Sequence, residues 1–100
     1  MKTIKNTVTK IKGLEDEFMT YGELLKIVAN EPPEKGLKVE EMRERFRILD
    51  AIENCGSADI NLEDADFNKL KSIYTNFAWL TTHKDLIALA DHLDELAKTT

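Results

Sequence analysis

One helical stripe between residues 39 and 54 constrains the fold more than any other feature of the chain. Apolar side chains recur there at intervals of 3, 4, 3 and 3 residues, which places them on one face of an α-helix. They are Val39, Met42, Phe46, Leu49 and Ile52. Ile48, Ala51 and Cys55 widen this stripe, so we expect the helix to be contacted from two sides and to form the buried centre of the core.

A capping box and two prolines bound a shorter helix before it. Thr20 is a good N-cap, and Glu23 lies three residues later, where it can complete the box. The prolines that follow Glu31 stop the helix there, because the residue before a proline avoids helical geometry. The connection over residues 31–38 is short, so the two helices should pack as close neighbours.

Two further helices are predicted in the second half of the chain. Acids crowd residues 63–66, where the positive end of a helix dipole favours them, and an apolar stripe continues to about Trp79. Thr82 is a candidate N-cap with Asp85 as its capping-box acid, and a last apolar stripe runs to Leu96. We therefore expect a mainly α fold, built as a compact four-helix domain.

The N-terminal segment is basic, and its conformation stays open. Four lysines give residues 1–12 a charge of +4, which leaves −9 for the remainder of a chain whose net charge is −5. The spacing of its apolar residues suits a strand or a helical turn. We predict a basic arm over 1–17, frayed or ordered by a partner, and a single helical domain over 18–100. A minor β pairing between residues 4–11 and 58–62 is compatible with both segments.

Composition and apolar run lengths exclude several classes of protein. Hydrophobic residues make up 42% and charged residues 33% of the chain, which is typical of a globular domain. No apolar run approaches the roughly 20 residues of a membrane span, and no signal peptide is visible. The single cysteine, Cys55, excludes an internal disulfide. We expect a cytoplasmic protein without membrane association.

Catalytic and metal-binding motifs are not recognisable. The acids between Asp59 and Asp66 superficially resemble a calcium loop, but they lack the glycine at position 6 and the glutamate at position 12. His83 and His92 have no further ligand at zinc-site spacing. A glycine-rich phosphate loop is also missing. We therefore predict that the protein is not an enzyme and needs no cofactor or metal.

Six residues are candidates for contact with a partner. They are Arg43, Arg45, Arg47, Trp79, Lys10 and Lys12. The three arginines are flanked by Glu40, Glu41 and Glu44, so their face is either solvated and salt-bridged or a contact patch for an acidic partner. Trp79 lies off the apolar stripe of its helix, and tryptophan is enriched at interface hot spots. The two lysines belong to the basic arm.

The run EPPEKGLKVEEMRERFRILDAIE, the later run INLEDADFNKLK and a following tryptophan resemble a set of small, uncharacterised proteins of tailed bacteriophages and prophages. The likeness covers residues 31–79. The residues that carry it are Pro32, Pro33, Gly36, Leu37, Met42, Arg43, Asp50, Leu62, Asp64, Asp66 and Trp79. The resemblance implies a phage protein that acts in the cytoplasm of the infected bacterium or within the virion.

We therefore predict a non-enzymatic, phage-encoded protein–protein interaction module, either a regulator or inhibitor of a host protein or an assembly and structural component. Its partner would be a host or phage protein, and it could also form a homo-oligomer. Nucleic acid is not expected, because an acidic body repels phosphates. The alternative is a helix-turn-helix DNA-binding transcriptional regulator in which Arg43, Arg45 and Arg47 meet phosphates, although the neighbouring glutamates oppose that role.

Overall fold

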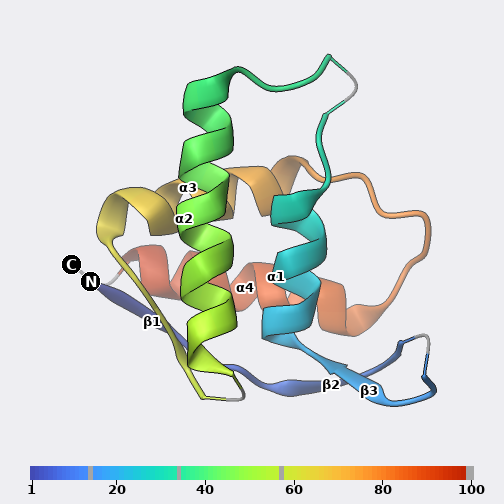
Figure 1. Ribbon diagram of the computed structural model, residues 1–100. Helices are drawn as coiled ribbons and strands as arrows, with labels where there is room; N and C mark the ends of the chain where they lie inside the picture. The colour runs from blue at the N-terminus through green and yellow to red at the C-terminus, as the bar shows by residue number, and fades with distance from the viewer. Residues whose placement is uncertain (14, 34, 57, 99–100) are drawn as a thin grey trace.

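Four helices and two small antiparallel sheets make up the described part of the chain in this computed structural model (Figure 1). The structure describes residues 1–13, 15–33, 35–56 and 58–98. The helices are α1 (Tyr21–Asn30), α2 (Val39–Cys55), α3 (Asp64–Asn76) and α4 (Lys84–Lys98). The strands are β1 (Lys2–Ile4), β2 (Val8–Lys12), β3 (Phe18–Thr20) and β4 (Ile60–Leu62). The predicted mainly α class is confirmed.

The first residues of the chain belong to the two sheets. β1 pairs antiparallel with β4, with Ile4 opposite Ile60, and both of these side chains are fully buried. A pairing between residues 4–11 and 58–62 was compatible with the sequence. The observed pair uses residues 2–4 and 60–62, so it shares only Ile4 with the first of these ranges. β2 and β3 form a second pair that the sequence did not predict. These paired strands lie on either side of the boundary predicted between residues 17 and 18.

Side chains of α4 hold the N-terminal segment against that helix. The Lys5 backbone N–H donates to His92 Nε2 at 3.1 Å, and the Lys10 backbone N–H donates to Asp85 Oδ2 at 2.8 Å. Lys10 meets Asp85 near the start of α4, whereas Lys5 meets His92 farther along it. The segment and the helix therefore run in opposite directions. Both acceptors bind backbone N–H groups, which gives the segment a defined position against α4.

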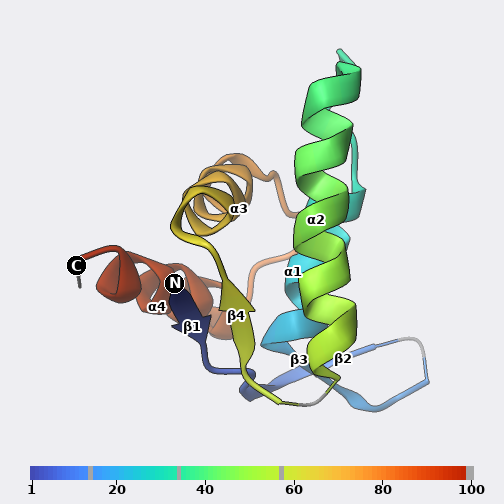
Figure 2. The ribbon, with the colours of Figure 1, turned by 60° about the vertical axis from the view of Figure 1, so that its left-hand side comes forward.

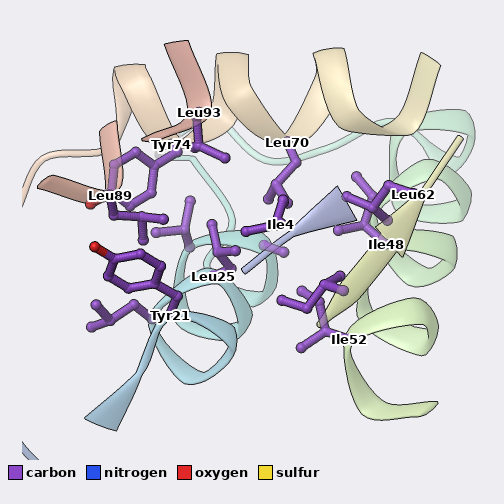
Figure 3. Packing of buried hydrophobic residues seen from close by; sticks show 14 of the residues in the cluster. Ile4, Tyr21, Leu25, Ile48, Ile52, Leu62, Leu70, Tyr74, Leu89 and Leu93 are labelled. Atoms are coloured by element: carbon purple, nitrogen blue, oxygen red, sulfur yellow. The ribbon is translucent and has the colours of Figure 1, made fainter. Parts of the chain in front are cut away.

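The core lies where β1 and β4 meet the four helices, and Figure 3 shows part of it. Its largest fully buried side chains are Phe67, Ile4, Leu24, Leu25, Ile48, Ile52, Ile60, Leu70, Leu89, Leu93 and Val28. α1, α3 and α4 each bury apolar residues at helical spacing, which are Leu24, Leu25 and Val28 in α1, Phe67, Leu70 and Tyr74 in α3, and Leu86, Leu89 and Leu93 in α4. The periodicity of these three helices therefore identified their core-facing sides correctly.

The central helix turns only part of the predicted stripe to the core. α2 buries Ile48 and Ile52, whereas Val39, Met42 and Phe46 are 61%, 41% and 61% exposed. Ten residues of α1 span about 15 Å and seventeen of α2 span about 25 Å, so the first turns of α2 extend past the end of α1. These first turns rise above α1 and α3 (Figures 1 and 2). Phe46 is exposed for a different reason, because it lies on the opposite side of the helix from the buried Ile48. The helix itself is confirmed, but the prediction that Val39, Met42 and Phe46 lie in the core is wrong. We call these three exposed side chains the α2 ridge.

The start of α4 also differs from the prediction. The helix begins at Lys84, so Thr82 is not its N-cap. His83 takes the capping role, because its Nδ1 accepts the backbone N–H of Asp85 at 3.1 Å. The Asp85 carboxylate accepts the N–H of Lys10 in the N-terminal segment. A tertiary contact has replaced the predicted capping box.

Acidification is expected to weaken the attachment of the N-terminal segment at His92. Burial lowers the pKa of His92 below its ordinary value of 6.5, the nearby Lys5 charge lowers it further, and Asp59 opposes the shift. Because the folded pKa lies below the unfolded one, this contribution to stability is complete above about pH 6.5. It is lost as the pH falls from there through the folded pKa. Urea unfolding at about pH 7.5 and about pH 5.5 should show the loss.

The pKa of His92 can also be measured directly, from the NMR titration of its ring proton. The His92→Gln variant provides the control, since glutamine cannot titrate in this range, and its unfolding free energy should depend less on pH than that of the wild type. A wild-type His92 that titrates at or above the value of an unfolded peptide would contradict the prediction.

Candidate binding cleft

A cleft of about 840 Å³ opens where the C-terminal ends of α1 and α3 meet the connection between α3 and α4. Its volume is within the range of roughly 300–1,000 Å³ that is common for ligand sites. Apolar side chains dominate the lining and come from segments that are distant in the sequence. They include Ile27, Pro32, Ile73, Phe77, Trp79 and Leu80.

The early end of α3 creates one wall of this cleft. The sequence predicts a helix that continues to about Trp79, but α3 ends at Asn76 and the backbone of Phe77 is extended. The Trp79 ring then lies edge-on to two aromatic rings, with centroids 4.7 Å from Phe77 and 6.0 Å from Tyr74. Edge-to-face contact is a favourable aromatic geometry. It holds Trp79 half-buried in the lining instead of fully exposed.

Tyr74 fixes the position of this wall relative to α4. Its buried hydroxyl donates to the Leu86 carbonyl at 2.6 Å. Burial, with a smaller contribution from Tyr21, raises the pKa of Tyr74 to about 12. The phenol therefore stays protonated and able to donate at neutral pH. This hydrogen bond ties α3 to α4 across the segment that connects them.

Two large apolar side chains at the cleft remain open to water. Leu80 is fully exposed, and Ile27 is 41% exposed. Both line the same cleft as the half-buried Trp79 and Phe77. Burial of such side chains by a ligand would remove apolar surface from water, which is the main favourable term in association. The cleft can therefore bind apolar groups.

Arg45 is the one cation among the described lining residues, and it is already engaged with the backbone. Its Nη1 donates to the carbonyls of Val28, Ala29 and Glu31, at 3.4, 3.3 and 2.9 Å. These carbonyls lie at the C-terminal end of α1, where helical partners run out, and the last turn of α1 has no basic residue. Arg45 of α2 therefore caps α1. Its Nε is buried and has no hydrogen-bond partner among the described residues.

The other two arginines predicted as partner contacts do not join the cleft. Arg43 is exposed and its Nη1 lies 3.8 Å from Glu40 Oε1. Arg47 donates from Nη2 to Asp66 Oδ1 of α3 at 3.3 Å. The three arginines thus have different surroundings, and only Arg45 shares a site with Trp79.

The two lysines predicted as partner contacts lie on β2. The Lys12 ammonium is 3.3 Å from the Asp16 carboxylate and 6.0 Å from the centroid of the Phe18 ring. The Lys10 side chain is exposed, while its backbone is bound to Asp85. Neither lysine lines the cleft.

The cysteine and both histidines of the chain lie outside the cleft lining, which includes Glu31, Ser72 and Thr81. The Cys55 thiol donates to the Ile52 carbonyl at 3.0 Å, and burial raises its pKa. The thiol form, which is the weaker nucleophile, is therefore favoured. Across residues 1–98, apart from the three undescribed positions, no three His, Cys, Asp or Glu side chains are grouped so that they could hold a metal ion.

Within the described residues, none of the helices combines the length and the apolar character needed to cross a bilayer. Comparison with protein-family models, with curated proteins and with solved structures finds no match to this chain. The relationship to bacteriophage proteins therefore stays a prediction.

Sequence reasoning identified Trp79 but missed Ile27, Ile73 and Leu80, because they come from three segments that only the tertiary structure brings together.

Proposed function

We propose that this protein is a non-enzymatic protein–protein interaction module whose cleft binds an apolar segment of a partner protein. The observation that carries the proposal is the lining of the cleft. Exposed and half-buried apolar side chains from three segments face a space of about 840 Å³. Arg45, the one cation among the described lining residues, is held by backbone carbonyls. Such a surface supplies desolvation and shape complementarity.

The partner segment is expected to carry basic residues beside its apolar anchors. The protein has a net charge of −5, and complementary charge steers association. Glu31 lies in the cleft lining, and its carboxylate makes no ion pair with any described residue. A host protein under regulation and a component of a phage particle both remain compatible with this proposal. The DNA-binding alternative gains no support, since Arg45 and Arg47 are engaged within the fold.

The single tryptophan makes occupancy of the cleft measurable. Trp79 is the only tryptophan of the chain, so its emission reports on the cleft alone. A designed amphipathic peptide of about 18 leucine and lysine residues should shift this emission to shorter wavelength and reach saturation. The same peptide with glutamate in place of lysine should bind more weakly. Equal binding of both peptides would contradict the charge preference.

Leu80→Asp is expected to weaken this binding at least about tenfold, which corresponds to about 1.4 kcal/mol. Leu80 is fully exposed, so the folded state should change in stability by no more than about 0.5 kcal/mol. Ile87→Asp is the matched control, because Ile87 is 61% exposed on α4 and does not line the cleft. Unchanged affinity in Leu80→Asp, or an equal loss in Ile87→Asp, would show that the peptide binds elsewhere.

A further inference from the structure

The α2 ridge is a second apolar surface, separate from the cleft. Val39 and Phe46 are each 61% exposed and Met42 is 41% exposed, and none of the three lines the cleft. Their spacing of three and four residues places them on one side of the helix. The first turns of α2 rise above the other helices in both ribbon views (Figures 1 and 2). A helix face of this kind is available to another helix.

Opposite charges lie on this face on either side of Phe46. Arg43 comes three residues before it and Asp50 four residues after it, so all three share one side of α2. The one ion pair of Arg43 with a described residue is a long contact of 3.8 Å with Glu40, and both side chains are well exposed. Asp50 takes part in none of the ion pairs that the described part of α2 makes.

We propose that the partner of the ridge is a second copy of this chain, docked as an antiparallel α2–α2 pair. A two-fold axis beside Phe46 makes the surface self-complementary, because each contact then occurs twice. Phe46 meets its own copy at the centre, and each Arg43 lies opposite the Asp50 of the other protomer. A parallel pair would instead place like charges together, which is unfavourable.

The size of the ridge limits the strength of this dimer. Stable interfaces bury about 800 Å² on each partner, and three exposed side chains on one helix offer less. The dissociation constant is therefore expected to be on the order of 0.1 mM. Sedimentation velocity from about 10 µM to about 1 mM should show a monomer at the low end and a dimer at the high end.

Phe46→Glu is expected to leave the protein monomeric over this whole range. Ile87→Glu is the matched control, since Ile87 is as exposed as Phe46 but lies on α4, and this variant should dimerise like the wild type. Far-UV circular dichroism shows whether both variants are folded. A wild type that is monomeric at about 1 mM overturns the proposal and assigns the ridge to another protein. A dimer that Phe46→Glu does not affect also overturns it.

Charge exchange tests the antiparallel geometry. Arg43→Asp or Asp50→Arg alone places like charges opposite each other at both ends of the interface and should weaken dimerisation at least about tenfold. The double variant brings opposite charges together again and should restore an affinity within about threefold of the wild type. A double variant that is as weak as the single variants would overturn the antiparallel pairing.

Discussion

Replacement of Ile4 by alanine is expected to lower the free energy of unfolding by about 2–5 kcal/mol. Ile4 is fully buried and lies opposite the equally buried Ile60 in the β1–β4 pair. Alanine removes three carbon atoms and leaves a cavity that the surrounding core closes only in part. Domains of this size have total stabilities of about 5–15 kcal/mol, so the loss is a large fraction. Urea unfolding followed by circular dichroism measures it.

Val8→Ala is the control within the same N-terminal segment. Val8 is 63% exposed, so its truncation should change the unfolding free energy by no more than about 0.5 kcal/mol. A frayed arm would make both substitutions neutral, because neither side chain would then contribute to the core. Small and equal effects would therefore contradict the position of β1 in the fold.

Local signals were sufficient to locate the helices. The Thr20 hydroxyl accepts the backbone N–H of Glu23 at 3.2 Å, as the capping-box pattern predicts, and α1 ends at Asn30, just before the prolines. The central helix was predicted over 39–54 and is found over Val39–Cys55. Caps and helix breakers act through neighbours in the sequence, so they can be recognised without the rest of the fold.

The environment of each helix face depends on tertiary structure and was harder to predict. The apolar side chains of α2 form one wide face that reaches from Phe46 around the helix to Ile48, and periodicity cannot tell which part of it meets another helix. The N-terminal segment presents the same difficulty, because its order depends on acceptors such as His92, 87 positions away from Lys5. Contacts over such separations leave no local pattern in the sequence.

The candidate site was predictable only in part for the same reason. Trp79 was chosen because tryptophan is common at interfaces, but its position in the lining follows from the early end of α3 and the contact with Phe77. Arg45 was read as one member of an exposed arginine face. Its actual role required the last carbonyls of α1 to lie beside it, which the sequence does not specify.

Arg45→Met is expected to lower the free energy of unfolding by about 2–3 kcal/mol. Hydrogen bonds to a charged group contribute about 1.5–3 kcal/mol, and this substitution also leaves the end of α1 without its cap. Methionine keeps much of the side-chain volume, so the loss reports on the guanidinium group more than on packing. Urea unfolding measures the total effect, and faster amide exchange at the end of α1 would locate it.

Arg43→Met separates this capping role from a general effect of charge. Arg43 lies on the same helix, is well exposed and has only the 3.8 Å contact with Glu40, so its replacement should cost no more than about 0.5 kcal/mol. Arg45→Lys should fall between the two, because lysine keeps the charge but lacks the planar fork that reaches several carbonyls. If Arg45→Met is no more destabilising than Arg43→Met, then Arg45 does not cap α1. Its guanidinium would then be free to bind a ligand in the cleft, and the apolar character on which the proposed function depends would have to be reconsidered.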